Sequence, residues 1–208
     1  PWWLPGGNLQ TIWAALRGVR YQDAKPLFRR ERWTTPDQDF VDVDWLVSTP
    51  NADPMTQPLL IVFHGLEGSS SSHYAEAFAD VAKSRGWACA VPHFRGCSGE
   101  INLAPRAYHS GDFVEIDWML RRFKAKHTGP LLAVGISLGG NALMRWAGEL
   151  ENAAADVVSA ITSVCSPLDL TASGKAISVG FNRQTYTRMF LGTMVPKAMQ
   201  KLAQHPQL

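Results

Sequence analysis

The sequence is poor in cysteine: Cys89, Cys97 and Cys165 are the only three among 208 residues. An odd number of cysteines, without a CxxC pair or a Cys/His spacing, argues against a disulfide framework and against a zinc site. The sequence therefore predicts no bound metal. It also favours a reducing compartment, and we expect a cytoplasmic protein.

An excess of charge of one sign is missing as well. Twenty Lys and Arg face eighteen Asp and Glu, so the formal net charge is only +2, which is too small to attract nucleic acid or an acidic membrane surface. No apolar run approaches the roughly 20 residues of a membrane span, and no secretory signal pattern is present. We therefore expect neither a nucleic-acid partner nor stable membrane insertion, and the oligomeric state stays open.

Nucleotide-binding motifs are also absent. No G-x-x-x-x-G-K-[ST] phosphate loop occurs, and the one glycine-rich turn after a late apolar segment has serine where a dinucleotide fingerprint needs its central glycine. We therefore predict no cofactor. What the chain does contain is 46% hydrophobic and 18% charged residues, a composition typical of a packed globular domain.

Short apolar runs alternate with segments of helical periodicity from residue 58 onward. Such runs suit strands that are buried on both faces of a parallel sheet, and the alternation predicts an α/β fold with helices on both faces. The predicted strands are residues 59–63, 87–91, 131–136 and 157–164. The predicted helices carry their apolar stripes on Tyr74, Phe78 and Val81; on Phe113, Ile116, Leu120 and Phe123; and on Leu138, Ala142, Trp146 and Leu150.

Two further strands precede these, at residues 28–34 and 40–47, joined by a polar turn at 36–39. In the second strand valines and Trp45 alternate with Asp42 and Asp44, which is the period of a half-buried strand. The pair therefore predicts an antiparallel hairpin at the N-terminal edge of the sheet. Before it, Asn8 is a candidate N-cap for a helix over residues 9–17.

Ser137 lies in the sequence GISLGG at residues 135–140, directly after an apolar strand and before a predicted helix. This is the setting of a nucleophile elbow, in which a sharp strand-to-helix turn lifts a serine hydroxyl above the sheet. Glycines two positions on either side of the serine are needed because β-carbons there would collide. The alternative is a glycine-rich turn that only packs the helix closely.

The sequence HGLEG at residues 64–68 follows the strand predicted at 59–63. A glycine-rich loop there can turn backbone amides toward the elbow and form the second half of an oxyanion hole. We expect the N–H groups of Leu66 and Leu138 to be the two donors. The alternative is an ordinary strand-to-helix loop.

The sequence offers no clear base or acid for Ser137. Asp169 and His205 follow Ser137 in the order Ser, Asp, His that a catalytic triad behind such an elbow requires. The surroundings of Asp169 nevertheless favour a helix cap, and His205 lies in a helix-like segment. We do not assign a triad to them.

Cys97 is not a nucleophile candidate. The irregular segment from His93 to residue 112 contains Arg95, Glu100, Arg106 and Asp112, for which we predict structural pinning rather than catalysis.

Several motifs together resemble one family. They are PWWLP at 1–5 with LQTIW at 9–13, HGLEG at 64–68, HFRGCSGE at 93–100 with YHSG at 108–111, and GISLGGN at 135–141. The chain resembles the YheT-like family of α/β-hydrolases, which includes bacterial esterases and eukaryotic relatives that act on acyl esters and phospholipids. The resemblance implies the α/β-hydrolase fold, Ser137 as nucleophile and the amides of Leu66 and Leu138 as oxyanion donors.

The chain departs from the family pattern at its C-terminus. The family supplies its triad acid after one further strand and its histidine after another, and neither strand is present, so we expect both groups to lie beyond Leu208. We interpret residues 1–170 as the N-terminal part of a hydrolase core and 171–208 as the start of a helical cap. The start at Pro1 rather than Met fits an N-terminal fragment, which we expect to be inactive alone.

The sequence thus predicts a serine hydrolase of carboxylic esters, acting on short- to medium-chain acyl esters or lipids through an acyl-enzyme on Ser137. Two other functions remain open. One is an acyltransferase that uses the same elbow to pass the acyl group to an alcohol. The other is a catalytically silent hydrolase-fold module that serves in binding.

Overall fold

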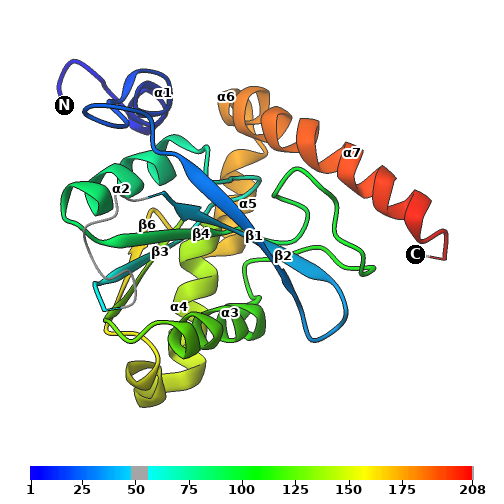
Figure 1. Cartoon of the computed structure of the whole chain (residues 1–208). Coiled ribbons are helices and arrows are strands. Elements are labelled where there is room, and N and C mark those ends of the chain that lie inside the picture. Colours follow the sequence, from blue (N-terminus) through cyan, green and yellow to red (C-terminus); the bar gives the residue numbers. More distant parts are fainter. Residues whose placement is uncertain (48–55, 208) are drawn as a thin grey trace.

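Six strands form one sheet in the order β1-β2-β4-β3-β5-β6, in a computed structural model that describes residues 1–47 and 56–207 (Figure 1). Strands β3, β4, β5 and β6 run parallel, while β1 and β2 extend the sheet as an antiparallel edge. The prediction of a mostly parallel sheet with an antiparallel N-terminal edge is therefore confirmed. The bounds are β1 Phe28–Thr34, β2 Phe40–Leu46, β3 Leu59–Phe63, β4 Ala88–Pro92, β5 Leu131–Ile136 and β6 Ala160–Val164.

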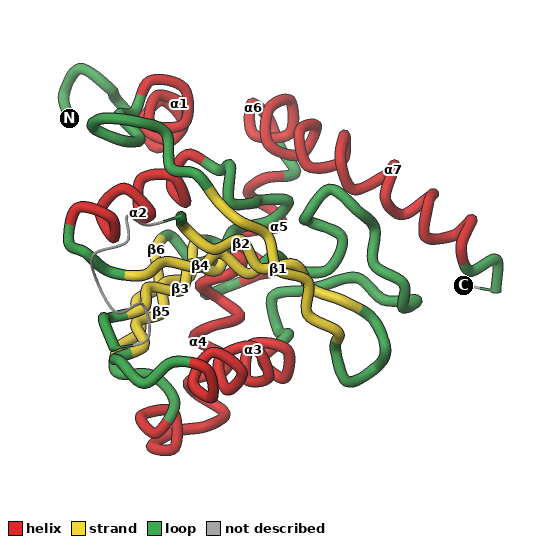
Figure 2. The backbone as a smooth tube through the Cα atoms, in the orientation of Figure 1, coloured by secondary structure: helices red, strands yellow, loops and turns green. Residues whose placement is uncertain are grey.

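Helices cover both faces of this sheet (Figure 2). Helices α3 and α4 pack on one face, where they share a core with Leu59, Ile61 and Phe63 of β3. Helix α2 packs on the other face, against Leu60 and Val62. The alternation along β3 follows from the two-residue period of a strand. The helices are α1 Gly7–Arg17, α2 His73–Ser84, α3 Phe113–Lys126, α4 Leu138–Leu150, the 3-10 helix Glu151–Asp156, α5 Leu170–Ile177, α6 Gly180–Asn182, the π-helix Arg183–Thr187 and α7 Arg188–Gln204.

Strand β2 differs from the half-buried strand that its alternation predicts. Asp42 and Asp44 are buried like the neighbouring Val41 and Val43. In the antiparallel register they lie opposite Arg32 and Arg30 of β1, and each arginine forms a two-bond ion pair with its partner aspartate at 2.7–2.9 Å. Pairing with arginine makes the burial of these carboxylates tolerable.

Three other local expectations are corrected. Strand β6 begins at Ala160 rather than at 157, and none of its residues is fully buried, because it is the last strand in the order of the described sheet. Val81 on α2 is 44% exposed, and the buried residues of that helix are three alanines, Ala75, Ala79 and Ala82, together with Glu76. Helix α1 starts at Gly7 with Gly6 as N-cap, so Asn8 does not cap it.

The pinning predicted for the segment of residues 93–112 is confirmed. The Arg95 guanidinium donates to Asp39 at 2.8 Å and to Glu115 at 2.6 Å, and it also contacts Asp37 in the hairpin turn. This one side chain therefore ties the loop to the hairpin and to α3. Two of the other predicted residues also form ion pairs: Glu100 pairs with Arg32, and Arg106 pairs with Asp112.

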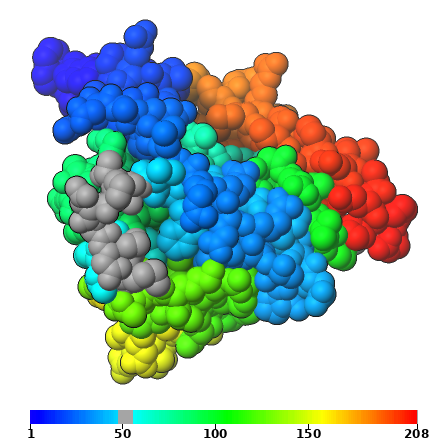
Figure 3. Space-filling view, in the orientation of Figure 1, coloured from blue at the N-terminus to red at the C-terminus, as the bar shows by residue number. Residues whose placement is uncertain are grey.

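Helix α7 lies along that segment at one edge of the molecule (Figure 3). It has no buried residue, and polar contacts hold it in place. Lys201 Nζ donates to the carbonyls of Asn102 and Ala104, and His205 Nε2 donates to the carbonyl of Leu103. No helix within residues 1–47 and 56–207 is long and apolar enough to cross a membrane.

Candidate active site

Ser137 occupies the tight turn between β5 and α4. Its backbone angles are φ 53° and ψ −116°, in the left-handed region that costs a residue with a side chain about 1–3 kcal/mol. Its amide donates to the carbonyl of Val164 at 2.8 Å. No other residue in the described part of the chain forms a hydrogen bond with Ser137 Oγ. The expected strand-to-helix elbow is therefore present at Ser137.

The glycines around Ser137 allow this turn to pack closely. A β-carbon on Gly135 would lie 2.5 Å from the α-carbon of Gly140, and one on Gly139 would lie 2.5 Å from the carbonyl oxygen of Phe63. Both distances are far below van der Waals contact. A side chain at either position would push α4 away from the end of the sheet, so the pattern GISLGG is required by the geometry of the turn.

The loop of residues 64–68 lies directly against the elbow. A β-carbon on Gly65 would be 3.3 Å from that of Ser137. The Gly65 carbonyl accepts hydrogen bonds from His64 Nδ1 at 2.8 Å and from the Gly68 amide at 3.0 Å. Because N–H and C=O of a trans peptide point in opposite directions, these bonds aim the Leu66 amide away from His64. Among the described residues no acceptor contacts the Leu66 amide.

The second expected donor is the amide of Leu138, the first residue of α4. The first amides of an α-helix have no partner within the helix, and the helix dipole favours negative charge at that end. The structure thus brings Ser137, Leu66 and Leu138 to adjoining turns at the carboxyl ends of β3 and β5.

His64 is fixed in one protonation state. Its ring is fully buried. Its Nε2 accepts a hydrogen bond from the amide of Phe94 at 3.1 Å, so Nδ1 carries the proton that is donated to Gly65. Burial lowers the pKa of His64 to about 3. The ring is therefore a neutral support of the loop and is not a base for Ser137.

Glu67 connects the same loop to two distant segments. Its amide donates to the Tyr108 hydroxyl at 2.7 Å, and the hydroxyl donates to Glu67 Oε1 at 2.9 Å. Its other oxygen forms an ion pair with Lys197 of α7 at 2.7 Å. The motifs HGLEG and YHSG contain the first two residues, but nothing in the sequence pairs them with each other or with Lys197.

The structure does not assemble a triad from Ser137, Asp169 and His205. Asp169 is the N-cap of α5 and accepts from the Ala172 amide at 2.8 Å, which confirms the helix-cap interpretation. His205 contacts the Leu103 carbonyl.

Burial raises the pKa of the Cys97 thiol to about 11, consistent with the expectation that it is no nucleophile. The contacts of the other histidines are His93 with Asp44, His109 with Asp112, His127 with Gln57 and His73 with Tyr74.

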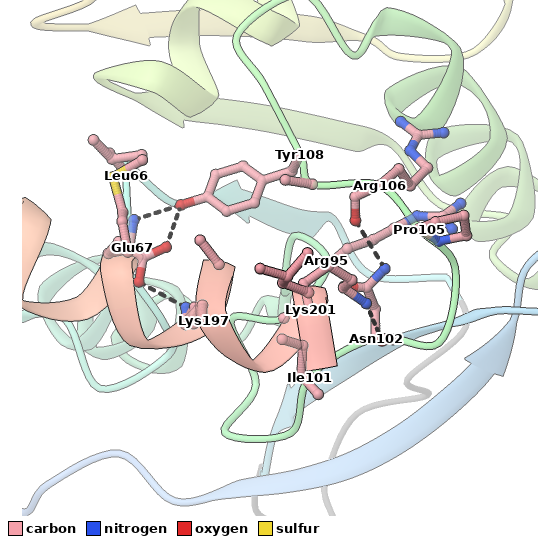
Figure 4. Close-up of a pocket in the computed structure, with 15 residues that line it drawn as sticks. Leu66, Glu67, Arg95, Ile101, Asn102, Pro105, Arg106, Tyr108, Lys197 and Lys201 are labelled. Atoms are coloured by element: carbon pink, nitrogen blue, oxygen red, sulfur yellow. Dashed lines mark hydrogen bonds and ion pairs between the residues drawn. The ribbon is translucent and has the colours of Figure 1, made fainter. Parts of the chain in front are cut away.

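A cavity of about 480 Å³ opens beside this loop (Figure 4). Leu66 and Glu67 form one end, the pinned segment around residues 95–108 forms a wall, and α7 covers it from the other side. The sequence does not predict this cavity, because it depends on where α7 lies. Within the described ranges, no cluster of three or more His, Cys, Asp or Glu side chains could hold a metal ion.

Comparison with known proteins gives consistent similarities. Residues 58–198 match the family described as alpha/beta hydrolase fold. The chain is 42% identical over 190 residues to the protein named "Putative esterase YheT" of Escherichia coli (strain K12), which covers 86% of this chain and 54% of that protein. It is 28% identical to "Phospholipase ABHD3" of Mus musculus, over 59% of this chain and 31% of that protein.

Among solved structures, the chain resembles alpha/beta hydrolase domain-containing protein 10 from mouse. The TM-score is 0.53 at 16% identity, and the match covers 77% of this chain and 58% of that one, a likeness of fold alone. The chain thus spans about half the length of its bacterial relative, and less of its mammalian one.

Proposed function

The chain belongs to the α/β-hydrolase fold family, in the YheT-like branch, and from that premise we propose that it carries the nucleophile and the oxyanion hole of a serine hydrolase of carboxylic esters. The observation that carries the proposal is the left-handed backbone of Ser137 beside the loop that holds the Leu66 amide. The substrates are short- to medium-chain acyl esters or lipids.

In the proposed mechanism, Ser137 Oγ attacks the ester carbonyl carbon, and its proton passes to a base. The carbonyl oxygen becomes an oxyanion, which accepts hydrogen bonds from the amides of Leu66 and Leu138. Donors of this kind, fixed before the reaction, stabilise developing charge without reorganisation. Collapse of the intermediate releases the alcohol, which takes the proton back, and leaves an acyl-enzyme. Water then attacks the acyl carbon and releases the acid.

We assign the base and the acid to sequence outside residues 1–208. The support is that the available candidates already have other contacts: His64 is buried and neutral, His205 contacts Leu103 and Asp169 caps α5. Without a base to take its proton, a serine hydroxyl is a weak nucleophile at neutral pH. The proposal therefore requires further strands that bring a carboxylate and a histidine to Ser137.

A fluorophosphonate probe tests the nucleophile in the extended protein, which includes the segments that carry the acid and the histidine. We expect stoichiometric labelling of the wild type and none of Ser137→Ala. Ser98→Ala is the matched control, because Ser98 lies in the pinned segment and not at the elbow, and it should be labelled normally. Equal labelling of Ser137→Ala and wild type would refute the assignment.

The 208-residue chain alone tests the missing base. We expect it to hydrolyse p-nitrophenyl acetate no faster than its Ser137→Ala variant. Turnover that this substitution abolishes would show that a base is present within the chain.

In the extended protein, product analysis with added alcohols separates hydrolysis from acyl transfer, since a transferase forms a new ester at the expense of the free acid.

A further inference from the structure

Two tyrosine hydroxyls hold the backbone amides on either side of the proposed oxyanion donor. The Gly65 amide donates to the Tyr74 hydroxyl at 2.9 Å. The Glu67 amide donates to the Tyr108 hydroxyl at 2.7 Å. The Leu66 amide lies between these two and has no acceptor among the described residues, so the hydrogen bonds of its neighbours decide how it is presented.

Glu67 has an unfavourable backbone conformation in this loop. Its φ is 57°, and Leu66 before it does not share a positive φ. The two are the central residues of a β-turn that the Gly68 amide closes onto the Gly65 carbonyl at 3.0 Å. A positive φ at the third position is the mark of a type II turn, which favours glycine there. Rotation of the Leu66–Glu67 peptide converts it into a type I turn, which suits a residue with a side chain and keeps the closing bond.

Tyr108 opposes that rotation because its hydroxyl is available to the turn only as an acceptor. Its single proton is donated to Glu67 Oε1 at 2.9 Å, which leaves a lone pair of the oxygen for the Glu67 amide. Since N–H and C=O of a peptide point in opposite directions, the rotated turn would direct the Leu66 carbonyl at this hydroxyl, with no proton left for it. Burial raises the pKa of Tyr108, so the hydroxyl stays protonated.

The two side chains that set this bond are themselves held in place. The Tyr108 ring stacks on Phe94, with ring centroids 5.3 Å apart and an interplanar angle of 9°. The Glu67 carboxylate is buried, and its Oε2 pairs with Lys197 of α7 at 2.7 Å, while its Oε1 is also contacted by the Cys97 thiol at 3.9 Å. Figure 4 shows the hydroxyl between the amide and the carboxylate of the same glutamate, with Lys197 beyond them.

We propose that Tyr108 is a positioning residue of the oxyanion hole. Its hydroxyl, oriented by the Glu67 carboxylate, selects the turn with a positive φ at Glu67 and so fixes the peptide that follows the Leu66 amide. The inference rests on the proposed function for its catalytic consequence, whereas the effect of Tyr108 on the turn does not depend on any reaction.

Hydrogen exchange of single amides, followed by NMR in the 208-residue chain, tests the effect on the turn. In Tyr108→Phe the Glu67 amide loses its acceptor and should exchange at least tenfold faster. The Gly68 amide should exchange as in the wild type, because both turn types keep its bond. Tyr21→Phe is the matched control, since the Tyr21 hydroxyl has no partner in the described part of the chain, and it should leave both rates unchanged.

Kinetics of the extended protein with p-nitrophenyl acetate test the effect on catalysis. Loss of an oxyanion donor costs about 10²–10³ in kcat, and a donor that is present but poorly positioned should cost less. We therefore expect Tyr108→Phe to lower kcat about 10- to 100-fold and to leave KM within about twofold, because the oxyanion forms only in the transition state.

Two substitutions of Glu67 separate the hydrogen bond from the charge. Glu67→Gln keeps an oxygen that accepts the Tyr108 proton and should retain kcat within about threefold. Glu67→Ala removes that oxygen and should lower kcat about as much as Tyr108→Phe. Equal losses in the glutamine and alanine variants would mean that the ion pair with Lys197, and not the orientation of the hydroxyl, supports the loop, which would overturn the inference.

Three further results would overturn it: unchanged exchange of the Glu67 amide in Tyr108→Phe, equal acceleration at Gly68, which indicates loss of the whole turn, or a kinetic effect confined to KM. Failure of the proposed function is distinguishable, because it would leave Ser137 unlabelled in the extended wild type while Glu67 exchange still responds to Tyr108→Phe. Labelling of Ser137 together with unchanged Glu67 exchange would refute the inference alone.

Discussion

His64 illustrates how a single residue can support the proposed site without taking part in the reaction. Its Nδ1 orients the Gly65–Leu66 peptide and its Nε2 receives the Phe94 amide, so both ring nitrogens are used in the neutral form. Sequence alone places this histidine at the end of a strand, where a catalytic base could also lie. Only the burial and the two backbone partners identify its role.

The lowered pKa of His64 predicts a loss of stability in mild acid. The folded protein keeps the ring neutral down to a pKa of about 3, whereas the ordinary value is 6.5. Between these pH values the unfolded chain binds one more proton, so stability falls as the pH falls. The loss due to this group from pH 7.5 to 5.0 should be about 2 kcal/mol.

Urea unfolding at the two pH values measures this effect, with His64→Gln as the comparison. Glutamine can still accept from the Phe94 amide but does not titrate, so its difference between pH 7.5 and 5.0 should be smaller by that amount. A variant with the same pH dependence as the wild type would show that His64 protonates normally in the folded protein.

At the scale of the element, two of the three glycines of α4, Gly139 and Gly148, have opposite surroundings. Gly139, in its first turn, faces the carbonyls at the end of β3, whereas Gly148 near its other end has nothing within 4 Å of an added β-carbon. The first glycine is required for the approach of the helix to the sheet. The second only weakens the helix, because glycine is a poor helix former.

Alanine substitutions should therefore have effects of opposite sign. Gly139→Ala should destabilise the protein by about 1–3 kcal/mol through overpacking against Phe63 and His64. Gly148→Ala should stabilise it by about 0.5–1 kcal/mol. Midpoints of urea unfolding at constant slope measure both changes. Stabilisation by both substitutions would contradict the close packing of the elbow.

At the scale of the whole molecule, buried ion pairs join the hairpin to the parallel part of the sheet. Asp44 of β2 accepts from Arg30, His93 and Ser70. Burial would raise the pKa of the Asp44 carboxyl, but these hydrogen bonds outweigh that effect and hold the pKa well below its usual range. Arg95 makes a second such junction, so the hairpin and the segment around residues 93–112 support each other.

Removing Arg95 should therefore be costly. Arg95→Met leaves the buried carboxylates of Asp39 and Glu115 without their cation, and it should lower the free energy of unfolding by about 3–5 kcal/mol. Arg121→Met removes an exposed partner of Asp117 and should cost less than about 0.5 kcal/mol. Both are measured by urea unfolding at pH 7. Similar costs for the two would mean that the Arg95 junction contributes no more than a surface pair.

The sequence by itself determined the elements and the elbow. Strands β1, β3 and β5 coincide with their predicted bounds. For β3 and β5 the reason is that continuous apolar runs between turn residues depend on local chemistry. The glycine spacing around Ser137 is likewise a local steric requirement, so its backbone could be predicted without knowing the rest of the molecule.

Only the tertiary structure decided how distant segments meet. Burial of Asp42 and Asp44, exposure of Val81, incomplete burial of β6, and the contacts of Glu67 with Tyr108 and Lys197 depend on how separate elements pack together. The cavity depends on α7, which contributes no buried residue and so leaves no strong hydrophobic pattern that would place it. Local patterns specify which face of an element is apolar, whereas the partner that covers it is set by packing of the whole chain.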